Sequence, residues 1–275
     1  MREKQKKTEK RRRFLIQGGI GVVVIAIAVI IVLVVVQNQQ NNVVSAASAA
    51  GPKNMLSDGI LFHGVNGKAT AVETAAIKKG GKPVATDTKK LTDTANIVEY
   101  IDLQCPYCQE FVEHNLAQED KWVAEGKATL EIHPIAFLDA SSEGTKYSSR
   151  AANAVACVAN FDPNDFLAVI KTMYQNQPAE ETSGLPNSKI LSLLSGAGAS
   201  SKQITGCVNG DSFSSWVTST TSRVENGTFV GVATTPVAFP GTPTVFVNGA
   251  RYTGTLTDAS TFKAFVNKQK PGTAS

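Results

Sequence analysis

The cysteines of the run Cys105-Pro106-Tyr107-Cys108 are the residues of this chain best suited to chemistry. Two cysteines separated by two residues can close a small disulfide ring, and a thiolate is the species that exchanges disulfides. A strand-like run, Asn96–Ile101, precedes the pair, and a helical run from Gln109 to about Glu125 follows it. A helix N-terminus stabilises a thiolate through its unpaired N–H groups and its dipole. The spacing and the strand-to-helix position therefore predict a redox dithiol.

The same pair is also compatible with half of a zinc site or with a structural disulfide. A four-cysteine zinc site needs a second closely spaced pair, but the two other cysteines, Cys157 and Cys207, lie 50 positions apart. No Ser-His-Asp or His-Glu-x-x-His pattern is present either. We therefore predict no metal site and no cofactor.

The N-terminus combines a basic cluster with a long apolar run. The first 13 residues carry eight Lys or Arg and two Glu, and subtracting their net +6 from the chain's +4 leaves about −2 for the rest. The folded part therefore has no basic surface for nucleic acid. Phe14–Val36 is 23 residues without a charge, and as a helix it spans about 34 Å, enough for a hydrocarbon core of about 30 Å.

This arrangement predicts a single-pass membrane anchor with a cytoplasmic N-terminus and an extracytoplasmic remainder. A cleaved signal peptide is the alternative, because Ala47-Ser48-Ala49 resembles a cleavage site. The apolar run is, however, longer than the h-region of about 7–15 residues that a signal peptide carries.

The cysteines at positions 157 and 207 belong to the predicted exported part. Disulfides form and persist outside the cytoplasm, and an even cysteine count leaves these two as a natural second pair. We therefore predict a structural disulfide between Cys157 and Cys207. The alternative is that each is a small buried apolar residue.

The rest of the sequence reads as strands, a helix, a strand, a helical block, a hairpin and a final helix. The strand-like runs are Ile60–Phe62, Ala69–Val72, Ile97–Ile101, Thr129–Ile135 and Thr244–Val247. Helical signals extend from Thr145 to about Asn226. Asn248-Gly249 predicts a two-residue hairpin turn, and Thr257-Asp258 predicts the cap of the last helix.

We divide the chain into six segments on this basis. They are a basic tail (1–13), an anchor (14–36), a flexible tether (37–58), the first part of a folded domain (59–135), a helical insertion (136–227) and the second part of that domain (228–270). The tether is predicted from the polar, low-complexity run that begins at Gln37.

A Cys-x-x-Cys pair lies between a predicted strand and a predicted helix. Beyond a helical block, Gly241-Thr242-Pro243-Thr244 leads into another predicted strand. This combination resembles the DsbA family of thiol–disulfide oxidoreductases. The resemblance covers roughly residues 60–270 and is greatest to the membrane-anchored DsbA-like proteins of actinobacteria. It implies an α/β thioredoxin fold with an inserted helical domain.

The resemblance also implies a role for each site residue. Cys105 matches the exposed nucleophile, and Cys108 matches the buried resolving cysteine. Thr242-Pro243 resembles the cis-proline loop that binds a peptide beside the dithiol, where Pro106 and Tyr107 also face the substrate. The sequence alone leaves Pro243 as an ordinary strand-start proline. Glu99, six residues before Cys105, matches the buried acid that moves protons to and from the resolving thiol, although its pattern equally suits a surface strand residue.

The function predicted from these features is a membrane-tethered, monomeric oxidase that introduces disulfides into reduced, unfolded exported proteins. A quinone-linked membrane protein of the DsbB or VKOR type is expected to reoxidise it. Two departures from the family bear on its oxidising strength: Pro-Tyr replaces Pro-His in the dithiol motif, and Thr242 replaces a valine.

Two alternative functions remain at this point. A disulfide isomerase or reductase would use the same chemistry, but residues 37–95 are too short and too polar for an isomerase's dimerisation module. A membrane-tethered chaperone or binding module with structural disulfides belongs to another class.

Overall fold

The computed structural model describes residues 50–88, 95–232 and 238–270. The predicted basic tail and the anchor at residues 14–36 lie outside the described residues, as does the tether up to residue 49. Among the helices that the structure does describe, none is both long enough and apolar enough to cross a membrane.

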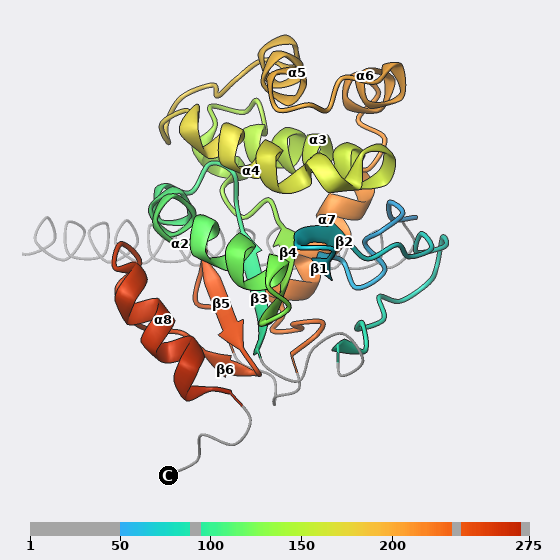
Figure 1. Cartoon of the computed structure of the whole chain (residues 1–275). Coiled ribbons are helices and arrows are strands. Elements are labelled where there is room, and N and C mark those ends of the chain that lie inside the picture. The colour runs from blue at the N-terminus through green and yellow to red at the C-terminus, as the bar shows by residue number, and fades with distance from the viewer. Residues whose placement is uncertain (1–49, 89–94, 233–237, 271–275) are drawn as a thin grey trace, which may run out of the picture. The chain divides into compact units, whose positions relative to one another are not determined.

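A six-stranded mixed sheet positions the rest of the described chain (Figure 1). Its strands in spatial order are β2 (Lys68–Ala71), β1 (Ile60–Val65), β4 (Ala128–Pro134), β3 (Ala95–Ile101), β5 (Thr244–Val247) and β6 (Ala250–Arg251). Strands β3 and β4 are parallel, and all other neighbouring pairs are antiparallel. A parallel pair needs a crossover connection, and helix α2 (Pro106–Ala124) provides it.

The hairpins at the two edges of the sheet turn on Asn-Gly pairs. Asn66 and Gly67 have φ angles of 51° and 74°, and Asn248 and Gly249 have 49° and 82°. Two-residue hairpin turns of type I′ need positive φ at both positions, which Asn and Gly tolerate best. The hairpin predicted at Asn248-Gly249 is therefore confirmed.

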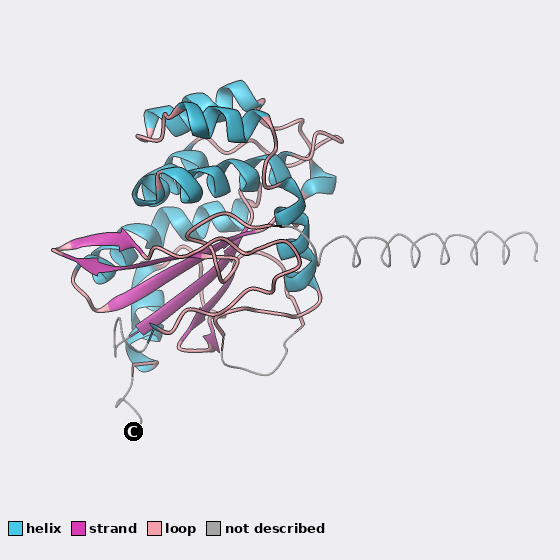
Figure 2. Cartoon of the chain, turned by 90° about the vertical axis from the view of Figure 1, so that its right-hand side faces the viewer, coloured by secondary structure: helices cyan, strands magenta, loops and turns pink. Residues whose placement is uncertain are grey.

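The described helices divide into those of the sheet domain and those of the insertion between β4 and β5. They are α2 and α8 (Ala259–Lys268) in the first group, and α3 (Tyr147–Phe161), α4 (Phe166–Gln175), α5 (Asn187–Gly196), α6 (Lys202–Asn209) and α7 (Ser214–Glu225) in the second. Short 3-10 turns occupy Asp139–Ser141 and Pro163–Asp165. Figure 1 shows α3 and α4 above α2 with α5 and α6 beyond them, and Figure 2 shows these helices as layers over one side of the sheet.

Strand β3 is buried on both faces, because helices cover both sides of the sheet at this position. Ile97 and Ile101 belong to the main core beneath α2, whereas Val98 and Tyr100 pack in a second cluster with Val224 of α7. Side chains alternate along a strand, so Glu99 lies on the same face as Ile97 and Ile101. This places Glu99 in the core rather than on the surface, with no exposed area.

The flexible tether predicted up to residue 58 is wrong for its last part. Residues 51–58 pack onto the folded unit, with Met55 fully buried. The Asn54 side chain donates a hydrogen bond of 2.8 Å to the Ala159 carbonyl, and Asp58 accepts one of 3.0 Å from the Trp216 indole. The low-complexity composition ends before this stretch, and its apolar and charged side chains have buried partners.

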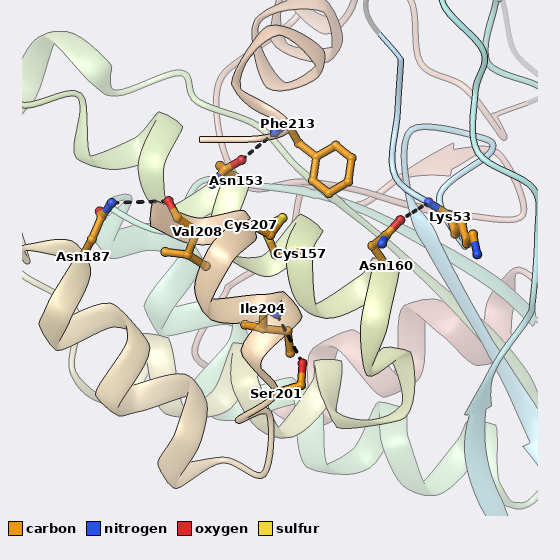
Figure 3. The surroundings of a disulfide bond; sticks show 10 residues. All are labelled: Lys53, Asn153, Cys157, Asn160, Asn187, Ser201, Ile204, Cys207, Val208 and Phe213. Carbon is orange, nitrogen blue, oxygen red and sulfur yellow. Dashed lines mark hydrogen bonds between the residues drawn. A yellow bond between two sulfur atoms is a disulfide. The ribbon is translucent and has the colours of Figure 1, made fainter. Parts of the chain in front are cut away.

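A disulfide between Cys157 and Cys207 joins α3 to α6 within the insertion (Figure 3). The S–S distance is 2.01 Å and the two Cα atoms are 5.9 Å apart. Nearby, the Asn153 side chain accepts a hydrogen bond of 2.8 Å from the backbone N–H of Phe213, at the start of α7. These contacts tie three helices of the insertion together.

Candidate active site

The predicted dithiol lies where β3 ends and α2 begins. Cys105 is the N-cap of α2 with an extended backbone, and Pro106 occupies the first helical position, where its missing N–H is no loss. The Cys105 carbonyl accepts hydrogen bonds of 3.1 Å from the N–H groups of Cys108 and Gln109. The Cys105 sulfur therefore lies at the N-terminal end of α2, where the backbone N–H groups of Tyr107 and Cys108 stabilise a thiolate.

The Cys105 thiol is unusually acidic. Its pKa falls from 9.0 to about 7, mainly because the Cys108 thiol donates a hydrogen bond to it. The Thr242 side chain and the backbone N–H groups of Cys108 and Tyr107 lower the pKa further, while burial opposes the shift. With a pKa of about 7, a substantial fraction of Cys105 is thiolate at neutral pH, and this makes it a competent nucleophile.

Cys105 is less accessible than the expected exposed nucleophile, with 3% of its surface exposed. Its sulfur lies 3.2 Å from the Thr242 carbonyl oxygen, to which the thiol donates a hydrogen bond. The two residues that follow it are exposed, with Tyr107 showing 60% of its surface. Pro106 and Tyr107 are therefore the exposed residues that directly follow the Cys105 sulfur in the chain.

The surroundings of Cys108 shift its pKa in the opposite direction. It is fully buried, and burial raises its pKa well above 9.0. Its hydrogen bond to Cys105 and the negative charge of a Cys105 thiolate raise the pKa further. At neutral pH the proton therefore stays on Cys108, and the reactive thiolate forms on Cys105.

The Thr242–Pro243 peptide bond is cis. Its residues precede β5, which pairs with β3 at Tyr100–Thr244, so the loop lies next to the N-terminus of α2. The sequence-predicted residues Cys105, Cys108, Thr242 and Pro243 are thus brought together, although 137 positions separate Cys105 from Thr242 in the sequence.

Glu99 faces a second buried carboxyl, Glu119 of α2. Both are fully buried, and among the described residues none of their four carboxyl oxygens has a hydrogen-bond partner, although each carboxyl lies close enough to shift the pKa of the other. Burial raises the pKa of Glu99 to about 7 and, together with the charge of Glu99, raises that of Glu119 well above 4.5. Because the two carboxyls act on each other, their protons are lost as a pair rather than independently.

The sequence analysis missed Glu119, although its position carried a signal. It lies three positions after Leu116 and four before Val123, both of which are buried on the core face of α2. An acid at that helical spacing is buried together with its neighbours.

A third buried acid, Asp102, was also missed. Its carboxylate accepts hydrogen bonds of 2.8 Å from the N–H groups of Gln104 and Leu138 and one of 2.7 Å from the Ser148 hydroxyl. Burial raises its pKa from 3.8 to about 6, and these three donors oppose the rise. Asp102 therefore remains mostly ionised at neutral pH. Its position directly after β3 was the signal available in the sequence.

The helical insertion holds the loop between β3 and α2 from outside. The Gln177 side chain donates hydrogen bonds of 3.0 Å and 3.1 Å to the carbonyls of Leu103 and Cys105. The Tyr174 hydroxyl of α4 donates one of 3.1 Å to the Asp102 carbonyl. Together with Ser148 of α3, these contacts fix the dithiol relative to the insertion.

This arrangement places an acidic thiol beside the exposed residues Pro106 and Tyr107, together with a buried partner thiol and nearby buried acids. Such a pair can exchange disulfides through a mixed disulfide at Cys105, with Cys108 as the second sulfur. Among the described residues, no group of three or more His, Cys, Asp or Glu side chains is placed to hold a metal ion.

Comparison with known proteins places this geometry in context. Residues 92–268 match the sequence model of a family described as thioredoxin. The structure of the reduced DsbA from Mycobacterium tuberculosis is similar, with 27% identity, a TM-score of 0.55, and coverage of 69% of this chain and 88% of that one. The reduced disulfide bond oxidoreductase DsbG from the same organism has 26% identity, a TM-score of 0.54, and coverage of 69% and 83%.

The oxidised BdbD from Bacillus subtilis shares the fold, with 16% identity, a TM-score of 0.54, and coverage of 82% of this chain and 99% of that one. No curated protein matches the chain. The predicted α/β thioredoxin fold with a helical insertion is confirmed by these similarities.

Proposed function

This chain belongs to the thioredoxin family and is a DsbA-like thiol–disulfide oxidoreductase, and from this premise we propose that it introduces disulfides into reduced, unfolded exported proteins. One observation carries the proposal: the pKa of Cys105 is lowered to about 7, whereas burial raises that of Cys108. The surroundings thus favour a thiolate at one sulfur and a thiol at the other.

The reaction begins from the Cys105–Cys108 disulfide. A substrate thiolate attacks the Cys105 sulfur, a mixed disulfide forms there, and Cys108 leaves as a thiolate that takes up a proton. A second substrate thiolate then attacks the substrate sulfur of the mixed disulfide. The substrate gains a disulfide, Cys105 leaves as a thiolate, and two electrons remain on the protein as the reduced dithiol. A quinone-linked membrane protein of the DsbB or VKOR type would accept these electrons.

The stabilised Cys105 thiolate supports the oxidising direction. Contacts that stabilise the thiolate stabilise the reduced protein, and this makes the disulfide the stronger oxidant. Tyr107 cannot provide the positive charge of a histidine at its position. We therefore expect a reduction potential below that of strongly oxidising DsbA, about −120 mV, and well above that of thioredoxin, about −270 mV.

The location of this activity follows from the N-terminal sequence. In this proposal the segment 14–36 is an uncleaved anchor, the basic cluster before it stays in the cytoplasm, and the catalytic residues lie outside. A reporter fused after residue 50 should function only if it is of a kind that works outside the cytoplasm. Activity of a reporter that works only in the cytoplasm would reject this topology.

The deciding experiment measures the direction of electron flow. The full chain is purified in mild detergent, equilibrated with glutathione mixtures, and tested for oxidative refolding of a reduced, unfolded substrate and for insulin reduction. We expect refolding with a potential in the range given above. A potential at or below that of thioredoxin, or insulin reduction without refolding, would make the protein a reductase.

Two variants separate the oxidoreductase from a chaperone that uses cysteines only as structural links. Cys105→Ser and Cys108→Ser should each abolish refolding, because neither can form the Cys105–Cys108 disulfide. In Cys108→Ser the Cys105 thiolate should still attack oxidised glutathione, keep one glutathione as a stable mixed disulfide and release the other as a thiolate, whereas Cys105→Ser should form no such adduct. Full holding of unfolded chains by Cys105→Ser, with no loss of any measured activity, would favour the chaperone.

A further inference from the structure

A groove between the sheet domain and the helical insertion is not used by the reaction described above. It has a volume of about 480 Å³ and runs between helices α2 and α4, which pack against each other (Figure 1). Ligand pockets in proteins measure about 300–1,000 Å³, so the groove has the size of a binding site.

The lining of this groove is apolar at its base. Val112 and Leu116 of α2 and Tyr174 of α4 line it, and all three side chains are buried. Two alanines, Ala117 of α2 and Ala168 of α4, line it as well, and both are exposed. Alanine is too short to fill the space between the helices. The groove therefore offers an apolar surface that an apolar side chain of a partner can cover.

The two sides of the groove carry opposite charges. Helix α2 contributes two exposed carboxylates, Glu113 and Asp120, and α4 contributes one exposed ammonium group, Lys171. Among the described residues, no ion pair joins these three side chains. Glu113 and Asp120 lie about two helical turns apart, so they are on the same side of α2. A positively charged partner is therefore attracted to the α2 side and repelled from the α4 side.

The groove begins close to the dithiol. Gln109, in the first turn of α2, donates a hydrogen bond of 2.8 Å to the carbonyl of Tyr174, which lines the groove. With a rise of about 1.5 Å per residue, the stretch of α2 from Val112 to Asp120 lies about 10–22 Å along the helix from Cys105. An extended chain covers this distance in about three to seven residues.

Building on the proposed oxidase function, we propose that this groove binds the substrate segment next to the cysteine that is joined to Cys105. The occupant is an extended stretch of a reduced, unfolded exported protein, with an apolar side chain in the groove and Lys or Arg side chains along α2. The apolar residue lies about three to five positions from the substrate cysteine, and the basic residues lie about four to seven positions from it. The groove thus favours cysteines with such neighbours over other cysteines of the same substrate.

Binding in the groove can be measured as the stability of a mixed disulfide. In the full chain carrying Cys108→Ser, no second protein sulfur can displace a partner from Cys105. This variant is converted to its glutathione adduct and equilibrated with a reduced peptide. The peptide thiolate attacks the Cys105 sulfur, the bond to the glutathione sulfur breaks, and glutathione leaves as a thiolate. The equilibrium constant of this exchange, read by mass spectrometry, compares the peptide with glutathione.

Three peptides with a single cysteine separate the apolar and the charged contributions. The first carries leucine at the fourth position and lysine at the fifth and seventh positions on both sides of the cysteine. The second has glutamate in place of lysine, and the third has serine at all of these positions. We expect the equilibrium constant of the leucine–lysine peptide to exceed that of the serine peptide by roughly tenfold, because it buries a leucine side chain. It should exceed that of the leucine–glutamate peptide by roughly threefold, and this second difference should vanish at about 1 M salt.

Substitutions in the groove should remove these preferences. Ala117→Phe and Ala168→Phe each fill the groove from an exposed position and should make the leucine–lysine and serine peptides nearly equal. Glu113→Gln/Asp120→Asn keeps the shapes and removes both charges, so the lysine and glutamate peptides should become equal while the preference for leucine remains. His114→Phe changes an exposed residue of α2 that does not line the groove, so this matched control should keep both preferences.

The ratios between peptides decide the outcome, because a disturbed dithiol would change the constants of all three peptides alike. Equal constants for all three peptides, with normal oxidative refolding by the native protein, would overturn the role of the groove alone. Both preferences in a protein that never oxidises a substrate would overturn the oxidase function alone. Preferences that persist in Ala117→Phe and Ala168→Phe would assign the peptide to another surface. Equal constants combined with an altered oligomeric state of these two variants would assign the groove to a second copy of the chain.

Discussion

Removal of the Cys157–Cys207 disulfide should destabilise the protein strongly without altering the reactive dithiol. The bond closes a loop of 50 residues that contains α4 and α5. In the chain-entropy relation, a loop of this length stabilises the folded state by about 4 kcal/mol. For a folded unit of this size, each kcal/mol shifts the melting temperature by about 2–4 °C, so we expect a decrease of roughly 8–16 °C.

The variant Cys157→Ala/Cys207→Ala tests this stabilisation of about 4 kcal/mol. Alanine is chosen because both cysteines are buried, Cys157 with no exposed surface and Cys207 with 6%, so that a polar replacement would add its own cost. Thermal and urea unfolding should be followed in a Cys105→Ser/Cys108→Ser background, in which only this disulfide responds to a reductant. Dithiothreitol should then lower the stability of the parent by nearly as much as the two alanines do, and it should leave the alanine variant unchanged.

The same reasoning predicts that the alanine variant retains the acidic Cys105 thiol when Cys105 and Cys108 are present, because the disulfide joins α3 to α6 and includes no residue of α2. An unfolding midpoint equal to that of the parent would refute the stabilising role. Two free thiols at positions 157 and 207 in the native oxidised protein would refute the pairing itself.

Three further outcomes can be measured on the same protein. Alkylation of the reduced dithiol should show a rate midpoint near pH 7 at Cys105, and a midpoint at or above the free-cysteine pKa of about 8.5 would contradict the acidic thiol. Glu119→Gln should be more stable to urea than the native chain above about pH 7 and no more stable below pH 4.5. The reason is that a buried carboxyl with a raised pKa makes the folded native chain less stable as the pH rises and the carboxyl has to ionise. A difference in stability that stays constant across this range would argue against a buried pair of acids with Glu99. Tyr107→His should shift the equilibrium with glutathione towards the reduced protein, and an unchanged equilibrium would remove the positive-charge argument.

Local patterns in the sequence were sufficient for the dithiol and its immediate supports. The strand before Cys105, the helix after it and the Asn248-Gly249 turn depend on neighbouring residues, and all three are present in the structure. The proximity of Thr242 to Cys105 is different, because sheet pairing between β3 and β5 creates it. The resemblance to a known family provided that long-range contact, and the sequence alone did not.

The acids were harder to predict because their burial depends on packing from distant segments. Glu99 shares a strand face with Ile97 and Ile101, and the packing of that face against α2 buries it. Glu119 lies on the core face of α2, but this helix also carries several exposed charged residues, so the sequence does not single out Glu119 as buried. Asp102 looks like a strand-end residue, and its burial depends on partners such as Ser148, which lies 46 positions away in the sequence.

The three buried acids differ in charge because the structure gives them different numbers of donors. Burial raises the pKa of each, yet Asp102 has three donors and is restrained to about 6, whereas Glu99 has only Glu119 and rises to about 7. The pKa of Glu119 is raised well above 4.5 by its burial and by the charge of Glu99. The dithiol is therefore not surrounded by three negative charges, which would oppose any thiolate. Instead, burial keeps the proton on Cys108, while hydrogen-bond donors gather around Cys105, the cysteine whose pKa is lowered.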